Sequence, residues 1–173
     1  PGLSFRYVET FGVTEMAYFG DTDHLNFPNG LDLDGAGNLW VTDSYGHRVL
    51  KYNPAGTFQM SVGKAGLRAV SDDTFDGPSD VAVDPSGNIW VADRGPDRVA
   101  KFDPSGNYLE QIGTDWEAGT DNAHLHDPMG LAFDVTGNIY VSDSSNHRVQ
   151  IFDSSGTYSA TLGESGVSGS DNT

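Results

Sequence analysis

Charged pairs at a fixed spacing are the first residues of this sequence that could do chemistry. An aspartate is followed five residues later by an arginine three times, as Asp43 and Arg48, Asp93 and Arg98, and Asp143 and Arg148. Carboxylates beside guanidinium groups occur in active sites, but structural ion pairs have the same composition. Because the pair returns in every copy of a repeat, we expect the aspartate to cap loop amides and the arginine to brace the loop.

Two residues that lie between the aspartate and the arginine of such a pair differ from copy to copy. Tyr45 and Arg94 stand where the other copies carry other residue types. A residue that a scaffold needs recurs in each copy, whereas a residue that serves one specific contact does not. We therefore expect Tyr45 and Arg94 to be ligand contacts rather than parts of the frame.

The five histidines contain one close pair, His124 and His126. In an extended chain the two imidazoles point to the same side, and Asp121 and Asp127 lie near them in sequence. A zinc site needs further converging ligands, so His124 and His126 are candidates without a third partner. The sequence has no cysteine, no Gly-x-Ser-x-Gly segment and no phosphate-binding loop. We predict no catalytic residue, no metal and no cofactor.

These residues belong to a repeat of 50 residues that occurs three times. The segment Gly37–Asp43 returns at 87–93 and at 137–143, and the glycines after it keep the same spacing. A fixed period of this length is typical of solenoids and propellers. Within one copy, short apolar runs separated by turn residues predict four strands. We place them at Gly30–Asp34, Asn38–Thr42, Arg48–Tyr52 and Thr57–Val62.

The expected fold is all-β, a β-propeller of four-stranded antiparallel blades. The second and third strands carry apolar residues at consecutive positions, which indicates sheets covered on both faces. Radially stacked sheets of this kind form a propeller. Asp or Asn followed by Gly in the links between strands fits tight type I turns.

The segment from Pro28 to Gly56 resembles the NHL repeat. It reads Pro-x-Gly-Leu-x-x-Asp-x-x-Gly-Asn-Leu-Trp-Val-x-Asp-Ser-x-x-His-Arg-Val-x-x-Tyr-x-x-x-Gly. The resemblance covers 27–163 and implies a six-bladed ring. Families with this repeat include RNA-binding and ubiquitin-ligase scaffolds, extracytoplasmic sensor domains, and a zinc-dependent lyase. In that lyase, histidines from several blades hold zinc on the axis, but the corresponding positions here are Asn29, Ser79 and Met129.

Three blades and an N-terminal outer strand make half, or a fragment, of such a ring. We divide the chain into an outer strand of a preceding blade (1–12), blade 1 (13–63), blade 2 (64–113), blade 3 (114–163) and a linker to a further blade (164–173). Either a longer chain is represented in part, or copies associate to complete the propeller. The first alternative is preferred, because a free half-ring would expose apolar blade faces.

The three linkers between blades share almost no sequence, and long loops on a rigid scaffold are where binding usually occurs. They add Tyr18, Arg68 and Trp116 to the contact candidates Tyr45 and Arg94. The alternative is that the linker aromatics fill small satellite cores. The favoured function is a non-enzymatic scaffold that binds a protein, peptide or glycan on the linker face. The other two hypotheses are a metal-dependent lyase or hydrolase, and a structural subunit that self-assembles through open blade edges.

The charge balance excludes some partners. The chain has 25 acidic and 9 basic residues, a formal net charge of −16. Nucleic acids need dense Lys and Arg to neutralise phosphates, so we expect no nucleic-acid partner. No apolar run reaches the ~20 residues of a membrane span, and we expect no membrane insertion. Acidity without cysteine is compatible with an extracellular or cell-surface location in a prokaryote, which is our expectation.

Overall fold

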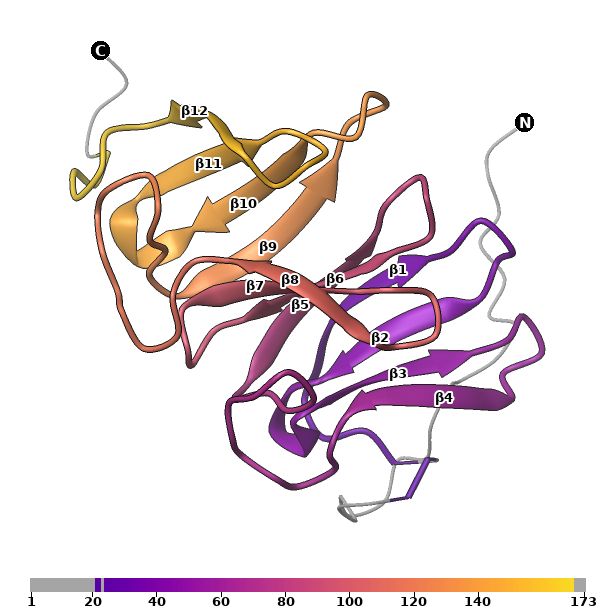
Figure 1. Ribbon diagram of the computed structural model, residues 1–173. Helices are drawn as coiled ribbons and strands as arrows, with labels where there is room; N and C mark the ends of the chain where they lie inside the picture. The colour runs from indigo at the N-terminus through magenta and orange to yellow at the C-terminus, as the bar shows by residue number, and fades with distance from the viewer. Residues whose placement is uncertain (1–20, 23, 170–173) are drawn as a thin grey trace, which may run out of the picture.

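The computed structural model describes residues 21–22 and 24–169, and they form three four-stranded antiparallel sheets (Figure 1). Blade 1 contains β1 (Pro28–Leu33), β2 (Leu39–Asp43), β3 (Arg48–Tyr52) and β4 (Phe58–Gly63). Blade 2 contains β5 (Pro78–Val83), β6 (Ile89–Asp93), β7 (Arg98–Phe102) and β8 (Tyr108–Ile112). Blade 3 contains β9 (Pro128–Phe133), β10 (Ile139–Asp143), β11 (Arg148–Phe152) and β12 (Tyr158–Leu162). The predicted propeller blades are confirmed; in blade 1 the third strand has the predicted ends, and the ends of the other strands are shifted by one or two residues.

Two connections between second and third strands contain a short 3-10 helix, η1 (Ser44–Gly46) and η2 (Ser144–Asn146). No helix among the described residues is long and apolar enough to cross a membrane. The outer strand that we predicted within 1–12 lies outside the described residues.

The tight turns follow from their Asp and Gly residues. In the turn between β7 and β8, the Gly106 amide donates to the Asp103 carbonyl at 2.9 Å, and Gly106 has a φ of 85°. The Asp103 carboxylate accepts bonds from the Asn107 side chain and from the Ser105 and Asn107 amides. These bonds, led by that of the Asn107 side chain, hold the pKa of Asp103 below its usual value. The polar groups of these turn residues are therefore used in hydrogen bonds that stabilise the turn.

Apolar layers between the blades form the core. Trp40, Val49 and Val62 of blade 1 pack in one cluster with Phe75 and Ile89 of blade 2. An equivalent cluster joins blade 2 to blade 3 and contains Trp90, Val99, Ile112, Leu125 and Ile139. Blade 2 is thus covered on both faces, which explains the consecutive apolar residues of its central strands.

The innermost strands β1, β5 and β9 lie next to one another where the three blades meet (Figure 1). Asp32 of β1 accepts a hydrogen bond from the Val83 amide of β5 at 2.8 Å. Asp80 of β5 accepts one from the Leu131 amide of β9 at 2.7 Å. Burial raises the pKa of Asp80, although hydrogen bonds from the Leu131 and Val81 amides oppose the rise. Side chains of one blade thus bind backbone amides of the next.

Candidate functional site

The repeated Asp–Arg pairs stabilise one face of the molecule. This face carries the linkers and the connections between the second and third strands. Asp43 ends β2 and Arg48 begins β3, and Arg48 Nε donates to Asp43 Oδ2 at 2.7 Å. Asp43 Oδ1 accepts from the Asn26 amide at 2.6 Å, and Arg48 donates to the His24 carbonyl. The expected structural role is present, but the amide that the aspartate caps belongs to the preceding linker and not to its own loop. The pair therefore fixes the linker on its blade.

Blade 3 repeats this arrangement with more bonds. Arg148 Nε donates to Asp143 Oδ2 at 2.6 Å, and the guanidinium also reaches the carbonyls of Thr120, Asp121 and His124. Both members of the pair are buried. A buried charge pair holds its geometry only when the remaining polar atoms are also satisfied, and the linker carbonyls satisfy the Arg148 donors.

Blade 2 departs from the pattern. Arg98 Nη2 lies 3.3 Å from Asp93 Oδ2, and Arg98 Nε has no partner. The guanidinium turns to the carbonyls of Ser71 and Thr74 in a linker of different sequence. Burial raises the pKa of Asp93 to about 7, because the more distant Arg98 offsets only part of the desolvation.

The linker face has a mouth near the innermost strands, lined by residues that differ between the copies. Phe27 and Tyr45 stack there with ring centroids 5.0 Å apart and an interplanar angle of 21°, and both rings are largely exposed. A hollow of about 40 Å³ beside them is also lined by Asn29, Ser79 and Arg94. We call the exposed side chains of Phe27, Tyr45 and Arg94 the mouth site.

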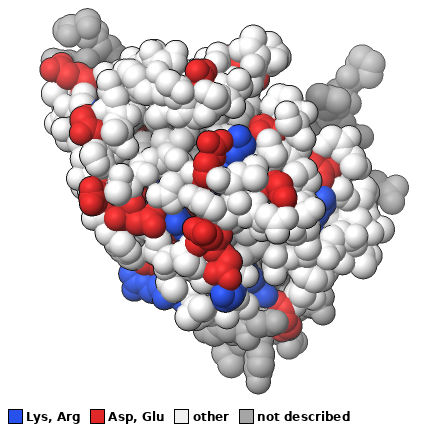
Figure 2. All heavy atoms as spheres, viewed as in Figure 1, with Lys and Arg blue, Asp and Glu red and all other residues white. Residues whose placement is uncertain are grey.

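Arg94 is the least restrained cation among the described residues. Its Nε lies 3.9 Å from Asp127 Oδ1, and about half of its side chain is exposed. Arg68, another predicted contact, is held more closely, with Nε 2.7 Å from Asp76 Oδ1. Lys51 and Lys101 lie over tryptophan rings and pair with acids. Figure 2 shows this distribution on one face, where blue atoms lie beside red ones.

Trp116 is exposed on the same face and has an unusual backbone. Its φ is 62°, and its side chain is 59% exposed. The residues at the same repeat position are Gly66 and Gly166, with φ of 70° and 77°. The amides of these three residues each donate to a carbonyl in the connection between the second and third strands of the preceding blade, at Gly46, Pro96 and Asn146. Trp116 thus keeps a conformation that costs an L-residue about 1–2 kcal/mol, which favours a role other than folding.

The remaining predicted candidates are placed as follows. His124 Nδ1 lies 2.7 Å from Asp121, whose hydrogen bond raises the pKa of His124. His126 is exposed, and Leu125 between them is buried in the blade 2–blade 3 core. The described residues contain no group of three or more His, Cys, Asp or Glu that could hold a metal. Tyr18 lies outside the described residues.

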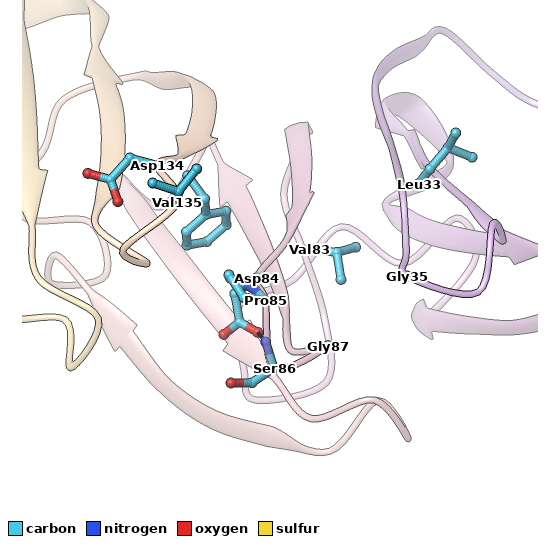
Figure 3. A pocket seen from close by; sticks show the side chains of 10 residues that line it. Leu33, Gly35, Val83, Asp84, Pro85, Ser86, Gly87, Asp134 and Val135 are labelled. Carbon is cyan, nitrogen blue, oxygen red and sulfur yellow. Dashed lines mark hydrogen bonds between the residues drawn. The ribbon is translucent and has the colours of Figure 1, made fainter.

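The opposite face has a larger hollow of about 500 Å³ (Figure 3). Leu33 and Gly35 lie on one side of it, Asp134 and Val135 on the other, and the turn at 84–87 between them. Its carboxylates are engaged in the turns, since Asp84 and Asp134 accept bonds from turn amides. We therefore attribute this hollow to the scaffold.

Comparison with known proteins agrees with this architecture. Residues 23–123 match the SMP-30/Gluconolactonase/LRE-like region, and residues 125–152 match the NHL repeat. The first match spans more than half of the sequence. The chain belongs to the SMP-30/gluconolactonase/LRE-like family. The NHL resemblance seen in the sequence is confirmed. No curated protein matches this member of the family.

Solved structures with the same fold belong to proteins of several kinds. A streptogramin B lyase is 15% identical, with a TM-score of 0.61, over 88% of this chain and 43% of its own. A virginiamycin B lyase from Staphylococcus aureus is 16% identical, with a TM-score of 0.57, over 80% and 42%. A chain of a nidogen/laminin complex is 18% identical, with a TM-score of 0.62, over 82% and 49%. This SMP-30/gluconolactonase/LRE-like chain spans less than half of each, and the likeness shows the fold alone.

Phe27 is the site residue that sequence reasoning missed. The same repeat position carries Gly77 and Asp127, so its copy-specific character was visible. It ends the first linker and was not among the predicted contacts. Only the stack with Tyr45 shows that the ring belongs to the mouth.

Proposed function

We propose that this chain is a non-enzymatic binding module whose mouth site binds a protein or peptide ligand. The observation that carries the proposal is the exposed, stacked pair Phe27 and Tyr45 beside Arg94. Exposed aromatic rings and arginine are the residue types that dominate binding energy in protein interfaces. None of the three is repeated in the other blades, so the scaffold does not require them.

The chemistry of the mouth favours a ligand with a flat apolar group and an acidic group. The stacked rings offer a surface for the apolar group, and the loosely held Arg94 offers a partner for a carboxylate. Ionic contact with Arg94 would carry specificity more than raw affinity. Trp116, exposed and strained on the same face, would enlarge the contact area.

An enzymatic role as a metal-dependent lyase or hydrolase finds less support in these residues. The positions at the axial entry carry Asn29, Ser79 and Met129. Ser79 Oγ is committed to the carbonyls of Ala92 and Pro128. An extracytoplasmic location in a prokaryote remains part of our proposal and rests on composition alone.

Peptide display tests the proposed function. Peptides selected on the immobilised chain from a random library should bind at least about tenfold more weakly to Tyr45→Ala and Arg94→Ala. The matched control is Val135→Ala, an exposed apolar residue on the opposite face. Selected peptides should contain Asp or Glu more often than the library. Failure to select any peptide, or selected peptides that bind both mouth variants as well as the control, would refute the proposal.

A further inference from the structure

A second carboxylate is buried beside the Asp–Arg pair of blade 2 and has no counterpart in the other two blades. Asp76 stands two residues before β5, at the repeat position where the other blades carry Asn26 and His126. The Asp76 side chain is 7% exposed, and the Asp93 side chain is not exposed at all. Blade 2 packs between blades 1 and 3, so both carboxylates are enclosed by neighbours that the structure describes.

The main chain of Asp76 fastens it to blade 2. The Asp76 amide donates to Asp93 Oδ1 at 2.8 Å, and the Asp76 carbonyl accepts from the Gly95 amide at 2.9 Å. The next amide, that of Gly77, donates to His47 Nδ1 in blade 1 at 3.3 Å. These three bonds hold the segment Asp76–Gly77 between the second-to-third-strand connections of blades 1 and 2.

This segment also forms part of the mouth. Gly77 and Arg94 both line the hollow beside Phe27 and Tyr45. Arg94 directly precedes Gly95 in the sequence. A displacement of this segment therefore reaches the mouth site twice, through Gly77 itself and through the bond to the connection that carries Arg94.

The arginine of blade 2 lies farther from its aspartate than the arginines of the other blades. In blades 1 and 3 the arginine Nε donates to the aspartate at 2.7 and 2.6 Å. In blade 2 only Arg98 Nη2 approaches Asp93, at 3.3 Å, and Arg98 Nε is buried without a hydrogen-bond partner. Arg68 Nε pairs with Asp76 Oδ1 at 2.7 Å from an exposed side chain, whereas Asp76 Oδ2 is buried and finds no partner among the described residues. Two buried carboxylates so weakly compensated do not both ionise without cost.

This cost gives the closed arrangement a pH dependence. Burial raises the pKa of Asp93 to about 7, and the charge of Asp76 adds to the rise, while Arg98 opposes it. A solvated aspartate ionises near its usual value of about 4. Between these two values the closed arrangement binds a proton that an open arrangement, with Asp76 in solvent, does not need. The closed arrangement is therefore fully favoured below about pH 4 and loses stability as the pH rises to about 7.

Other titratable or charged groups face this cluster from several elements. They are His47 in blade 1, Arg68 in the same linker, Arg98 in β7, Tyr108 in β8 and Asp115 in the following linker. Arg98 Nη1 lies 3.4 Å from Asp115 Oδ1, so Asp93 shares its cation. His47 acts in the opposite direction, because burial lowers its pKa from 6.5 and protonation of Nδ1 removes the acceptor of the Gly77 amide as the pH falls.

We propose that Asp76 and Asp93 form a pH-dependent latch, which holds the segment Asp76–Gly77 closed in acid and releases it as the solution approaches neutral pH. On release Asp76 moves into solvent, and Arg98 takes the closer position that the arginines of the other blades have. The connection that carries Arg94 then loses its bond to the linker. The latch itself is independent of the proposed function, but its effect on binding at the mouth site rests on that function.

Amide hydrogen exchange of the whole chain, followed by NMR between pH 5 and pH 7, tests the latch. Each rate is divided by the intrinsic rate at the same pH, which leaves the protection of that amide. We expect the protection of the Asp76 and Gly95 amides to fall at least about tenfold across this range. The His126 amide is the internal control, because it donates to Asp143 in blade 3, where the second carboxylate is lacking.

Three substitutions separate the latch from other effects of pH, and all three proteins retain His47. Asp93→Asn removes the ionisable group but keeps an oxygen for the Asp76 amide, so protection should no longer depend on pH. Asp76→Asn introduces the residue type that blade 1 has at this position and should reduce the fall to less than about threefold. Asp73→Asn is the matched control, because Asp73 is an exposed aspartate of the same linker that pairs with Lys64; it should keep the full fall.

A fall that is present in the unsubstituted protein and in Asp73→Asn, but absent from Asp93→Asn and from the His126 amide, supports the latch. Constant protection of the Asp76 and Gly95 amides in the unsubstituted protein overturns it, and so does a fall of equal size in Asp93→Asn. If Asp93→Asn does not fold, an undiminished fall in Asp76→Asn overturns the latch and a reduced fall supports it. No ligand takes part in this experiment, so its failure leaves the peptide-display result untouched, and a failed display leaves the latch intact.

Discussion

At Trp116 we predict that the glycine variant is more stable than the alanine variant, which is the reverse of the usual order. Its φ of 62° places it in the left-handed region, where the equivalent residues are glycines. Trp116→Ala and Trp116→Gly remove the same ring, so their difference in stability reports the backbone alone. Left-handed geometry costs alanine about 1–2 kcal/mol, and glycine's extra unfolded-state freedom returns about 0.5–1 kcal/mol. We expect the glycine variant to be more stable by about 0.5–1 kcal/mol.

Thermal and urea unfolding measure this difference. For a chain of this length, about 1 kcal/mol corresponds to a Tm shift of about 2–4 °C. Leu67 is the control, because it is exposed and has no positive φ. There the alanine variant should be more stable than the glycine variant by about 0.4–1 kcal/mol. An alanine variant at 116 that equals or exceeds the glycine variant in stability would refute the strain assigned to Trp116.

Three further predictions concern the frame. Arg148→Ala should lower the free energy of unfolding by about 3–5 kcal/mol in urea melts, since buried Asp143 loses its charge partner; a loss below about 1 kcal/mol contradicts this. Phe75→Ala should lower the free energy of unfolding by about 3–5 kcal/mol in the same assay, because the ring is fully buried; a loss below about 1 kcal/mol would contradict its packing between blades 1 and 2. Burial lowers the pKa of His47 from 6.5, so the unfolded chain takes up that proton first and stability falls as pH drops below about 6.5. His47→Asn should reduce this loss between about pH 7.5 and pH 5, and an unchanged pH profile would exclude the contribution of His47.

The strands could be predicted because their signals are local. Apolar runs between Asp and Gly turns place four strands in each repeat, and the hydrogen-bond ladders follow them. The starts of the first strands were placed late because the ladder continues past an irregularity, so that Pro28 pairs with Asp43. A pairing across such a break depends on the neighbouring strand and leaves no mark in the local pattern.

The candidate site could be predicted only in part. Comparing the copies singled out Tyr45, Arg94 and Trp116, which lie exposed on the linker face. The same comparison did not single out Phe75 and Leu125, although both stand three residues before the repeated proline, because the sequence does not show which linker side chains enter the preceding blade. Those contacts are made between residues brought together only by the packing of blades, and the mouth-site stack of Phe27 on Tyr45 arises in the same way.

Side chains of one blade bind main-chain atoms of the following blade, and the Ser44 and Ser79 hydroxyls donate to the Pro78 and Pro128 carbonyls. His47, Asp97, Asp32 and Asp80 accept from main-chain amides of the following blade. The following repeat therefore contributes main-chain atoms and one apolar side chain, Phe75 or Leu125, to the blade before it. Few of its other linker residues are fixed by contacts with that blade. This arrangement allows a duplicated repeat to join its parent immediately and its linker to diverge afterwards without loss of fit. Among the three copies the turn residues of the frame are therefore similar, whereas the linkers differ in sequence.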